Sequence, residues 1–81
     1  MYDIYYIVHT KDGDFMRVEI LIKEIRESKN ITLDELSKKS GVSKSHLNYI
    51  ERNEKEPSIS VLCRVAIALK VDIKELYRVI V

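Results

Sequence analysis

Four uncharged hydrogen-bonding side chains gather in one short stretch of the sequence. Residues 40–51, SGVSKSHLNYIE, predict a helix from Lys44 to about Arg52, with Leu47 and Ile50 on its buried side. The opposite side carries, in place of the usual Glu and Lys, the residues Ser45, His46, Asn48 and Tyr49. Hydroxyl, imidazole and amide groups donate and accept directional hydrogen bonds, so this face could recognise a partner's pattern of donors and acceptors. These residues alone leave a merely solvated face as the alternative.

The composition bounds the kind of protein that carries this face. The chain has 81 residues, 46% of them apolar and 33% charged, which is typical of one small globular domain. Glycine and proline are scarce, with two and one residues, and this scarcity favours helices over a turn-rich β fold. The single cysteine, Cys63, excludes an internal disulfide and a cysteine-based zinc site, and fits a reducing compartment. No secretory signal pattern and no membrane-spanning apolar run occur, so a cytoplasmic location is expected.

The net charge of +1 points to no particular partner, but the distribution of charge is uneven. Residues 1–15 carry a net charge of −2, from three acids and one base. A modest basic patch lies in residues 37–55, where two acids face five bases, namely Lys38, Lys39, Lys44, Arg52 and Lys55.

The N-terminal segment is set apart from the rest of the chain. Its residues YDIYYIVH predict a strand, and KDGD predicts a turn. Because a helical pattern is read from Met16 onward, residues 1–15 are interpreted as an appendage, or as an upstream extension, of a domain formed by residues 16–81.

Five helices are predicted in residues 16–81. The first covers residues 16–28, and the second follows Thr32, which forms a capping box with Glu35. After the turn at Gly41, Ser43 caps the third helix. The fourth follows Ser58, and the fifth starts at a capping pair, Asp72 and Glu75. The expected fold is therefore all-α, a compact five-helix domain with a short N-terminal strand.

The segment TLDELSKKSGVSKSHLNYIERNEKEPSISVLCRVAIAL resembles the phage-repressor (Cro/repressor, xenobiotic-response-element) type of helix-turn-helix domain. The resemblance covers residue 16 to about residue 78. The matching positions are Arg26, Thr32, Leu36, Gly41, Val42, Ser43, Leu47, Ile50, Glu51, Pro57, Ser58, Leu62, Ala66, Leu69 and Leu76. The resemblance implies a dimeric, sequence-specific DNA-binding domain of a transcriptional regulator, whose third helix enters a major groove.

The resemblance assigns base contacts to the residues of the third helix, namely Lys44, Ser45, His46, Asn48 and Tyr49. Apart from Lys44, the helix wheel selects the same face, and an Asn amide can pair with adenine in a bidentate way. Leu33 and Ser37 depart from the family's frequent Gln and Ala, which puts a base or phosphate contact at Leu33 in doubt. His46 is not expected to bind a metal, because the only other histidine lies in the N-terminal segment.

Two further sets of charged and polar residues have expected roles. The candidate contacts to the DNA backbone are Thr32, Lys38, Lys39, Arg52, Lys55 and Ser58, for which a solvated surface position is the alternative. The family pattern suggests an ion pair between Arg26 and Glu51 that ties the first helix to the third. Since Glu51 is near the buried side of its helix, it needs a charged partner.

Apolar residues that the helix pattern leaves outside the core predict a homodimer contact. This predicted interface is formed by Tyr5, Ile7, Cys63, Ile67, Val79, Ile80 and Val81. The N-terminal strand could pair with its mate or with the apolar C-terminal tail, or it could fold back over its own helices. Cys63 is interpreted as a small apolar residue rather than a nucleophile.

The predicted function is that of a transcriptional regulator, a repressor, which binds an inverted-repeat operator in double-stranded DNA as a homodimer. No catalytic residues, cofactor, metal or membrane partner are expected, and the chain is expected in the cytoplasm with the nucleoid. The first alternative is an antitoxin-like module of the same fold that acts on a protein partner. The second is a scaffold domain that has lost DNA binding.

Overall fold

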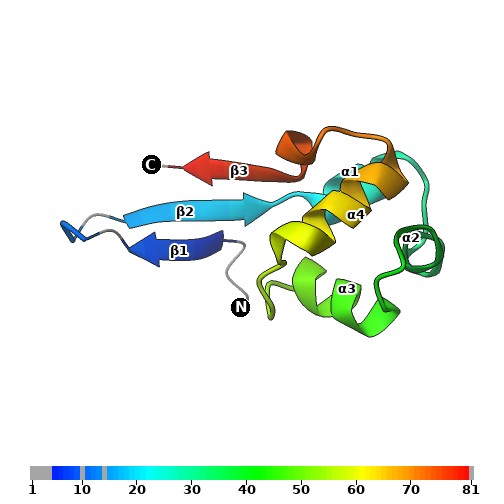
Figure 1. Ribbon diagram of the computed structural model, residues 1–81, viewed down its shortest axis with the longest axis horizontal. Coiled ribbons are helices and arrows are strands. Elements are labelled where there is room, and N and C mark those ends of the chain that lie inside the picture. The colour runs from blue at the N-terminus through cyan, green and yellow to red at the C-terminus, as the bar shows by residue number, and fades with distance from the viewer. Residues whose placement is uncertain (1–4, 10, 14, 81) are drawn as a thin grey trace.

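The computed structural model describes residues 5–9, 11–13 and 15–80. In this part the elements follow in the order β1 (Tyr5–His9), β2 (Phe15–Ile20), α1 (Ile22–Ser28), α2 (Leu33–Ser40), α3 (Lys44–Glu51), α4 (Ile59–Leu69), the 3-10 helix η1 (Ile73–Leu76) and β3 (Tyr77–Ile80). The helices form one body, and the strands project from one side of it (Figure 1). Among the described helices, none is long and apolar enough to cross a membrane.

The three strands form an antiparallel sheet with β2 in the centre. β1 and β2 are joined by a tight turn in which Gly13 has a φ of +86°, a conformation that disfavours side chains with a Cβ. β3 pairs with the other edge of β2, so that Val18 faces Val79 and Ile20 faces Tyr77. The two ends of the described chain therefore meet in one sheet.

This sheet corrects the all-α prediction. The predicted N-terminal strand is confirmed over Tyr5–His9 and the turn over residues 11–13, while residues 2–4 and 14 of these predictions lie outside the described residues. A second strand, β2, follows where the first half of a helix over residues 16–28 was expected. The apolar residues of this stretch fit two periods, since Val18 and Ile20 alternate with polar residues while Val18 and Ile22 fit a helix. The predicted boundary between residues 15 and 16 falls inside β2.

The prediction of a fifth α-helix is also wrong. The capping box of Asp72 and Glu75 is present, but it starts a single 3-10 turn of four residues. Tyr77 then takes an extended conformation with a φ of −149° and begins β3. The apolar C-terminal tail is thus partly used within the chain's own sheet, and the fold is mostly helical with four α-helices.

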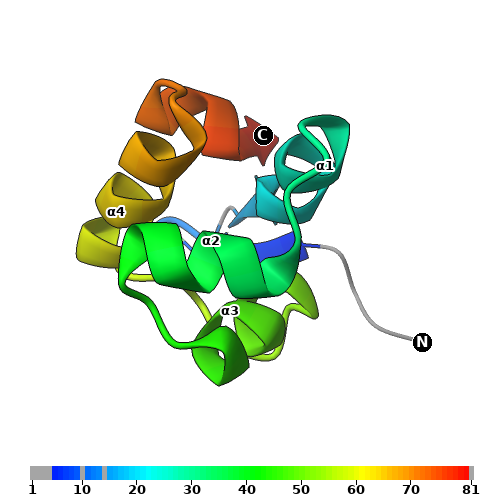
Figure 2. The ribbon, with the colours of Figure 1, turned by 90° about the vertical axis from the view of Figure 1, so that its right-hand side faces the viewer.

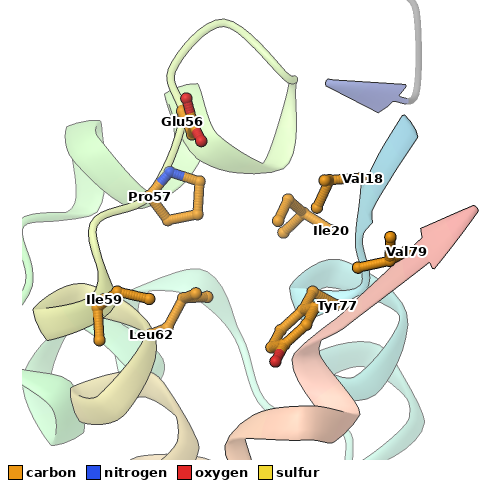
Figure 3. A pocket seen from close by; sticks show the side chains of 8 residues that line it. All are labelled: Val18, Ile20, Glu56, Pro57, Ile59, Leu62, Tyr77 and Val79. Atoms are coloured by element: carbon orange, nitrogen blue, oxygen red, sulfur yellow. The ribbon is translucent and has the colours of Figure 1, made fainter. Parts of the chain in front are cut away.

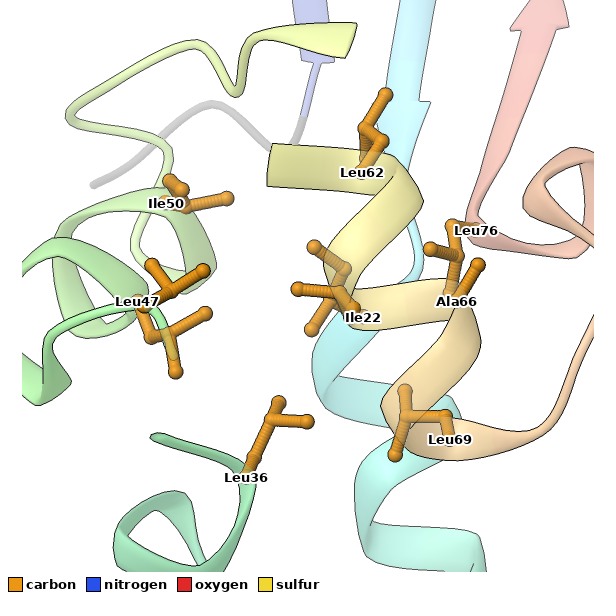
Figure 4. Close-up of a cluster of buried hydrophobic side chains, with 10 residues drawn as sticks. Ile22, Leu36, Leu47, Ile50, Leu62, Ala66, Leu69 and Leu76 are labelled. Carbon is orange, nitrogen blue, oxygen red and sulfur yellow. The ribbon is translucent and has the colours of Figure 1, made fainter. Parts of the chain in front are cut away.

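Among the described residues, ten buried apolar side chains make up the core, and every helix contributes to it (Figure 4). They are Ile22, Leu36, Val42, Leu47, Ile50, Leu62, Val65, Ala66, Leu69 and Leu76. Burial of each large member contributes about 1.5–3 kcal/mol. A backbone hydrogen bond from the N–H of Leu21 to the carbonyl of Leu76, 2.8 Å long, joins the start of α1 to the end of η1. This core fixes the direction in which α3 faces.

Candidate nucleic-acid interface

Helix α3 lies beneath α2 at the edge of the helical body, while α4 and α1 lie higher, to the left and right of α2 (Figure 2). Its side chains Leu47 and Ile50 have no exposed surface and anchor the helix in the core. The remaining face is directed outward by this anchoring, since residues three and four positions apart share one side of a helix.

The turn that precedes α3 is built from a glycine and serine hydroxyls. Gly41 ends α2 in the left-handed region with a φ of +73°. Ser43 has an extended backbone, and its hydroxyl accepts a hydrogen bond of 3.2 Å from the N–H of His46. Because the cap satisfies a free N–H of the first turn, the start of α3 at Lys44 is well defined, as the sequence predicted.

Two serines of α2 hold this turn, and sequence reasoning did not assign them that role. The hydroxyl of Ser37 donates a hydrogen bond of 2.6 Å to the carbonyl of Val42. The N–H of Val42 donates one of 3.2 Å to the hydroxyl of Ser40. Both backbone polar groups of the buried Val42 are thus satisfied by side chains, which links the orientation of α3 to α2. The only signal in the sequence was that Ser37 departs from the family's Ala.

The predicted base-contacting residues all lie on or beside the outward face of α3. Lys44 and Ser45 are exposed, and so is Tyr49, with 45% of its surface accessible. His46 and Asn48 are half-buried. Amide, hydroxyl, imidazole and phenol groups are thereby offered together on one side of the helix.

The structure brings Arg26 of α1 and Glu51 of α3 together in a bidentate ion pair. Arg26 Nε donates to Glu51 Oε2 over 2.8 Å, and Nη2 donates to Oε1 over 3.0 Å. Arg26 Nη1 also donates to the carbonyl of Ile31 over 2.9 Å. The two side chains are only 12% and 6% exposed. The hydrogen bonds to Glu51 raise the pKa of Arg26 above its usual value, which keeps the guanidinium charged.

Two of the bases near α3 form exposed ion pairs. Lys44 Nζ lies 3.1 Å from Asp34 Oδ1 of α2, and Arg52 lies 2.9 Å from Glu54. Such exposed pairs are weak, and a phosphate could exchange with either carboxylate. The contact with Asp34 was not predicted, since no local pattern links positions ten residues apart.

The other predicted backbone contacts lie at helix ends. Lys38 and Lys39 are exposed in the last turn of α2, and Lys55 is exposed in the loop before α4. The hydroxyls of Thr32 and Ser58 cap α2 and α4 by accepting backbone N–H groups over 3.1 Å. A capping hydroxyl still has its own proton to donate, so each of these groups can bind a phosphate oxygen at a helix N-terminus.

The predicted dimer residues do not form one surface. Ile7 is paired with Arg17 and Arg17 with Ile80, whereas Val79 is paired with Val18. Since neighbouring residues of a strand face opposite sides, Ile7 and Val79 lie on opposite faces of the sheet. Cys63 and Ile67 are exposed on α4. The side chain of Tyr5 and the whole of Val81 lie outside the described residues.

An apolar groove of about 270 Å³ lies between the sheet and the start of α4 (Figure 3). Val18, Ile20, Tyr77 and Val79 line its sheet side, and the other side is formed by Glu56, Pro57, Ile59 and Leu62. Sequence reasoning missed this groove, because it depends on the pairing of β2 with β3. Within the described part of the chain, no group of side chains could hold a metal ion.

A family model described as helix-turn-helix matches residues 22–76, from the start of α1 to the end of η1. The chain belongs to the helix-turn-helix family. It is of the phage-repressor type. The members of this family are DNA-binding transcriptional regulators rather than enzymes. The match leaves out β1, β2 and β3.

Curated relatives place this helix-turn-helix chain among transcriptional regulators. The regulator SinR of Bacillus subtilis is 45% identical over 56 residues, which are 68% of this chain and 50% of SinR. The ImmF control region 10 kDa protein of Bacillus phage phi105 is 33% identical over 63 residues, or 78% of this chain and 70% of that protein. In SinR, as in several of these relatives, the match spans half of the protein or less.

Solved structures of helix-turn-helix proteins show the same arrangement. The N-terminal DNA-binding domain of SinR from Bacillus subtilis superposes with a TM-score of 0.62 at 44% identity, over 65% of this chain and 78% of that domain. The restriction-modification controller protein C.AhdI from Aeromonas hydrophila gives 0.65 at 26% identity, over 67% of this chain and 82% of that protein. SinR has also been solved in complex with DNA and in complex with the SinI protein.

Proposed function

We propose that this chain is a sequence-specific DNA-binding repressor of transcription that binds an inverted-repeat operator as a homodimer. Helix α3 enters the major groove of each half-site, and its outward side chains contact base edges. The hydroxyls of Thr32 and Ser58, with Lys38, Lys39, Arg52 and Lys55, contact the flanking phosphates. Such contacts supply affinity and register, whereas the base contacts supply specificity.

The observation that carries this proposal is the outward face of α3. Ser45, Asn48 and Tyr49 have no carboxylate between them on the helix, although carboxylates are frequent elsewhere on the surface. Two nearby acids are paired with bases, Asp34 with Lys44 and Glu51 with Arg26. A surface without uncompensated negative charge can approach the phosphates of a duplex. The solved SinR–DNA complex, 44% identical over the match, supports the same role for this chain.

Selection from a random pool of DNA duplexes with the purified chain tests this function. Enrichment of a short inverted repeat, with half-sites about one helical turn apart, is expected for a dimer with two-fold symmetry. If the chain retains DNA in a salt-sensitive way but enriches no sequence, it binds phosphates without reading bases. Enrichment of a single, unrepeated site would support sequence-specific DNA binding but contradict the homodimer.

A protein partner is the second candidate function. The exposed apolar groove beside β3 offers a surface that a partner could cover, and SinR has been solved with the SinI protein. The absence of any DNA retention in the selection, together with a protein that protects Ile59 and Val79 from solvent, would favour this candidate.

A further inference from the structure

Helix α4 has a second apolar side that faces solvent. Its buried side carries Leu62 and Leu69, which belong to the core. On another side, Ile59 and Ile67 are 72% and 78% exposed, and Cys63 between them is exposed as well. These three residues, here called the α4 stripe, are spaced by four positions and therefore form one continuous ridge along the helix. The two isoleucines are the most exposed large apolar side chains that the structure describes.

We propose that the α4 stripe binds the α4 stripe of a second copy of this chain, with the two helices antiparallel and a two-fold axis at Cys63. The inference rests on the homodimer in the proposed function and names its surface. Around this axis, Ile59 of each copy packs against Ile67 of the partner subunit. Cys63, the smallest of the three side chains, sits where the helices approach most closely.

The charges at the ends of the stripe favour this antiparallel register. Glu56 lies three residues before Ile59, and Lys70 lies three residues after Ile67. Both are exposed. An antiparallel pair brings the N-terminal end of each α4, which Glu56 precedes, toward the C-terminal end of the other α4, where Lys70 of the partner subunit follows, and it does so twice. A parallel pair of helices would instead bring like charges together, which costs free energy. The surface is therefore complementary to itself in one orientation only.

The size of the surface sets the expected strength of the contact. A stable interface buries about 800 Å² on each partner, which is more than three side chains of one helix supply. Ile59 also lines the groove beside β3, so the stripe continues toward the exposed Val79 (Figure 3). Ile7 lies on the other face of the sheet and takes no part. We expect a weak dimer, with dissociation in the micromolar range.

Sedimentation velocity of the full chain over a range of concentrations tests the contact. Ile67→Glu places a charge in the centre of each isoleucine pair and is expected to weaken dimerisation at least about tenfold. Ile7→Glu is the matched control, since it changes another exposed isoleucine, 57% exposed, on the far face of the sheet and is expected to leave dimerisation unchanged. Circular dichroism confirms that each variant is folded. A wild-type monomer at all concentrations, or equal effects of both substitutions, would overturn the proposal.

Charge reversal tests the register. Lys70→Glu alone is expected to weaken the dimer, because it leaves two acids opposite each other. Glu56→Lys combined with Lys70→Glu restores opposite charges across the axis and is expected to restore the dimer. Failure of the double variant to recover would overturn the antiparallel pairing.

Cys63 provides a reporter at the axis. Copper–phenanthroline oxidises the two thiols of a pair to one disulfide, and the two electrons and two protons pass to the oxidant. A linked dimer is expected from the wild type and from Ile7→Glu, but not from Ile67→Glu. Retention of random duplex DNA by the same samples is scored separately. A monomer that retains DNA overturns the homodimer and its α4 contact but leaves DNA binding standing, and a dimer that retains none overturns only the DNA-binding function.

Discussion

Among single residues, Glu51 combines the deepest burial of a charge with a direct link to the candidate DNA surface. Its side chain is 6% exposed and accepts two hydrogen bonds from Arg26. Glu51→Ala leaves the guanidinium of Arg26 buried with its carbonyl partner alone. Since loss of one member of a buried ion pair is costly, we expect the free energy of unfolding to fall by about 3 kcal/mol. Urea denaturation monitored by circular dichroism measures this change.

The matched control is Glu54→Ala. Glu54 also pairs with an arginine, Arg52, over 2.9 Å, but the two side chains are 30% and 46% exposed. An exposed pair of this kind contributes less than about 1 kcal/mol. Equal losses in the two variants would mean that burial does not decide the importance of the Arg26–Glu51 pair.

Asn48 and Lys39 should separate specificity from affinity. Asn48 lies half-buried on α3, whereas Lys39 is exposed in the last turn of α2. Once the operator is known, Asn48→Ala is expected to reduce discrimination at one base pair by about 1–3 kcal/mol. Lys39→Ala is expected to weaken binding to all DNA sequences alike. It should also reduce the slope of log affinity against log salt concentration by about one. Fluorescence polarisation with operator and mutated duplexes distinguishes them, and a uniform loss in Asn48→Ala would argue against base readout there.

At the scale of elements, the capping box at the start of α2 predicts a dependence of stability on pH. The backbone N–H of Thr32 donates a hydrogen bond of 3.1 Å to Glu35 Oε1. This hydrogen bond, together with one that involves the Thr32 side chain, lowers the pKa of Glu35. A lowered pKa stabilises the fold above the unfolded value of about 4.3 and ceases to do so as the pH falls through the folded value. In Glu35→Gln the melting temperature should therefore drop less than in the wild type between neutral and acidic pH. A drop of the same size in both proteins would contradict the assignment.

The elements also show what the sequence could predict. Helices α2, α3 and α4 begin at the predicted caps Thr32, Ser43 and Ser58, because each cap is a local signal within four residues of the hydrogen bond that it forms. The outward face of α3 followed from the same local periodicity. An extended C-terminal tail paired with a strand was among the alternatives, but its pairing with β2 could not be foreseen, since that ladder joins residues such as Glu19 and Arg78, which are 59 positions apart. The groove depends on such distant contacts, which no local pattern records, whereas the exposure of Cys63 and Ile67 in the α4 stripe followed from the helix pattern.

At the scale of the whole molecule, the sheet and the helical body should unfold together. β2 runs into α1 within two residues, and η1 runs directly into β3. The hydrogen bond between Leu21 and Leu76 joins these two connections between the sheet and the helical body. Val18 of β2 faces the start of α4 across the groove (Figure 3). A sheet that is tied to the helical body by two connections at one end, and packed against α4 on one side, is expected to give the helices part of their stability.

Val18→Asp tests this coupling. The substitution places a carboxylate among apolar side chains of the groove, which is expected to lower the free energy of unfolding by about 1–3 kcal/mol. If the sheet and the helices form one cooperative unit, the helical signal should melt earlier in a single transition. Ile7→Asp, on the exposed face of β1, is the control and should leave the melting temperature nearly unchanged. An unchanged helical transition in Val18→Asp would show instead that the domain matched by residues 22–76 is stable by itself and that the sheet is an independent attachment.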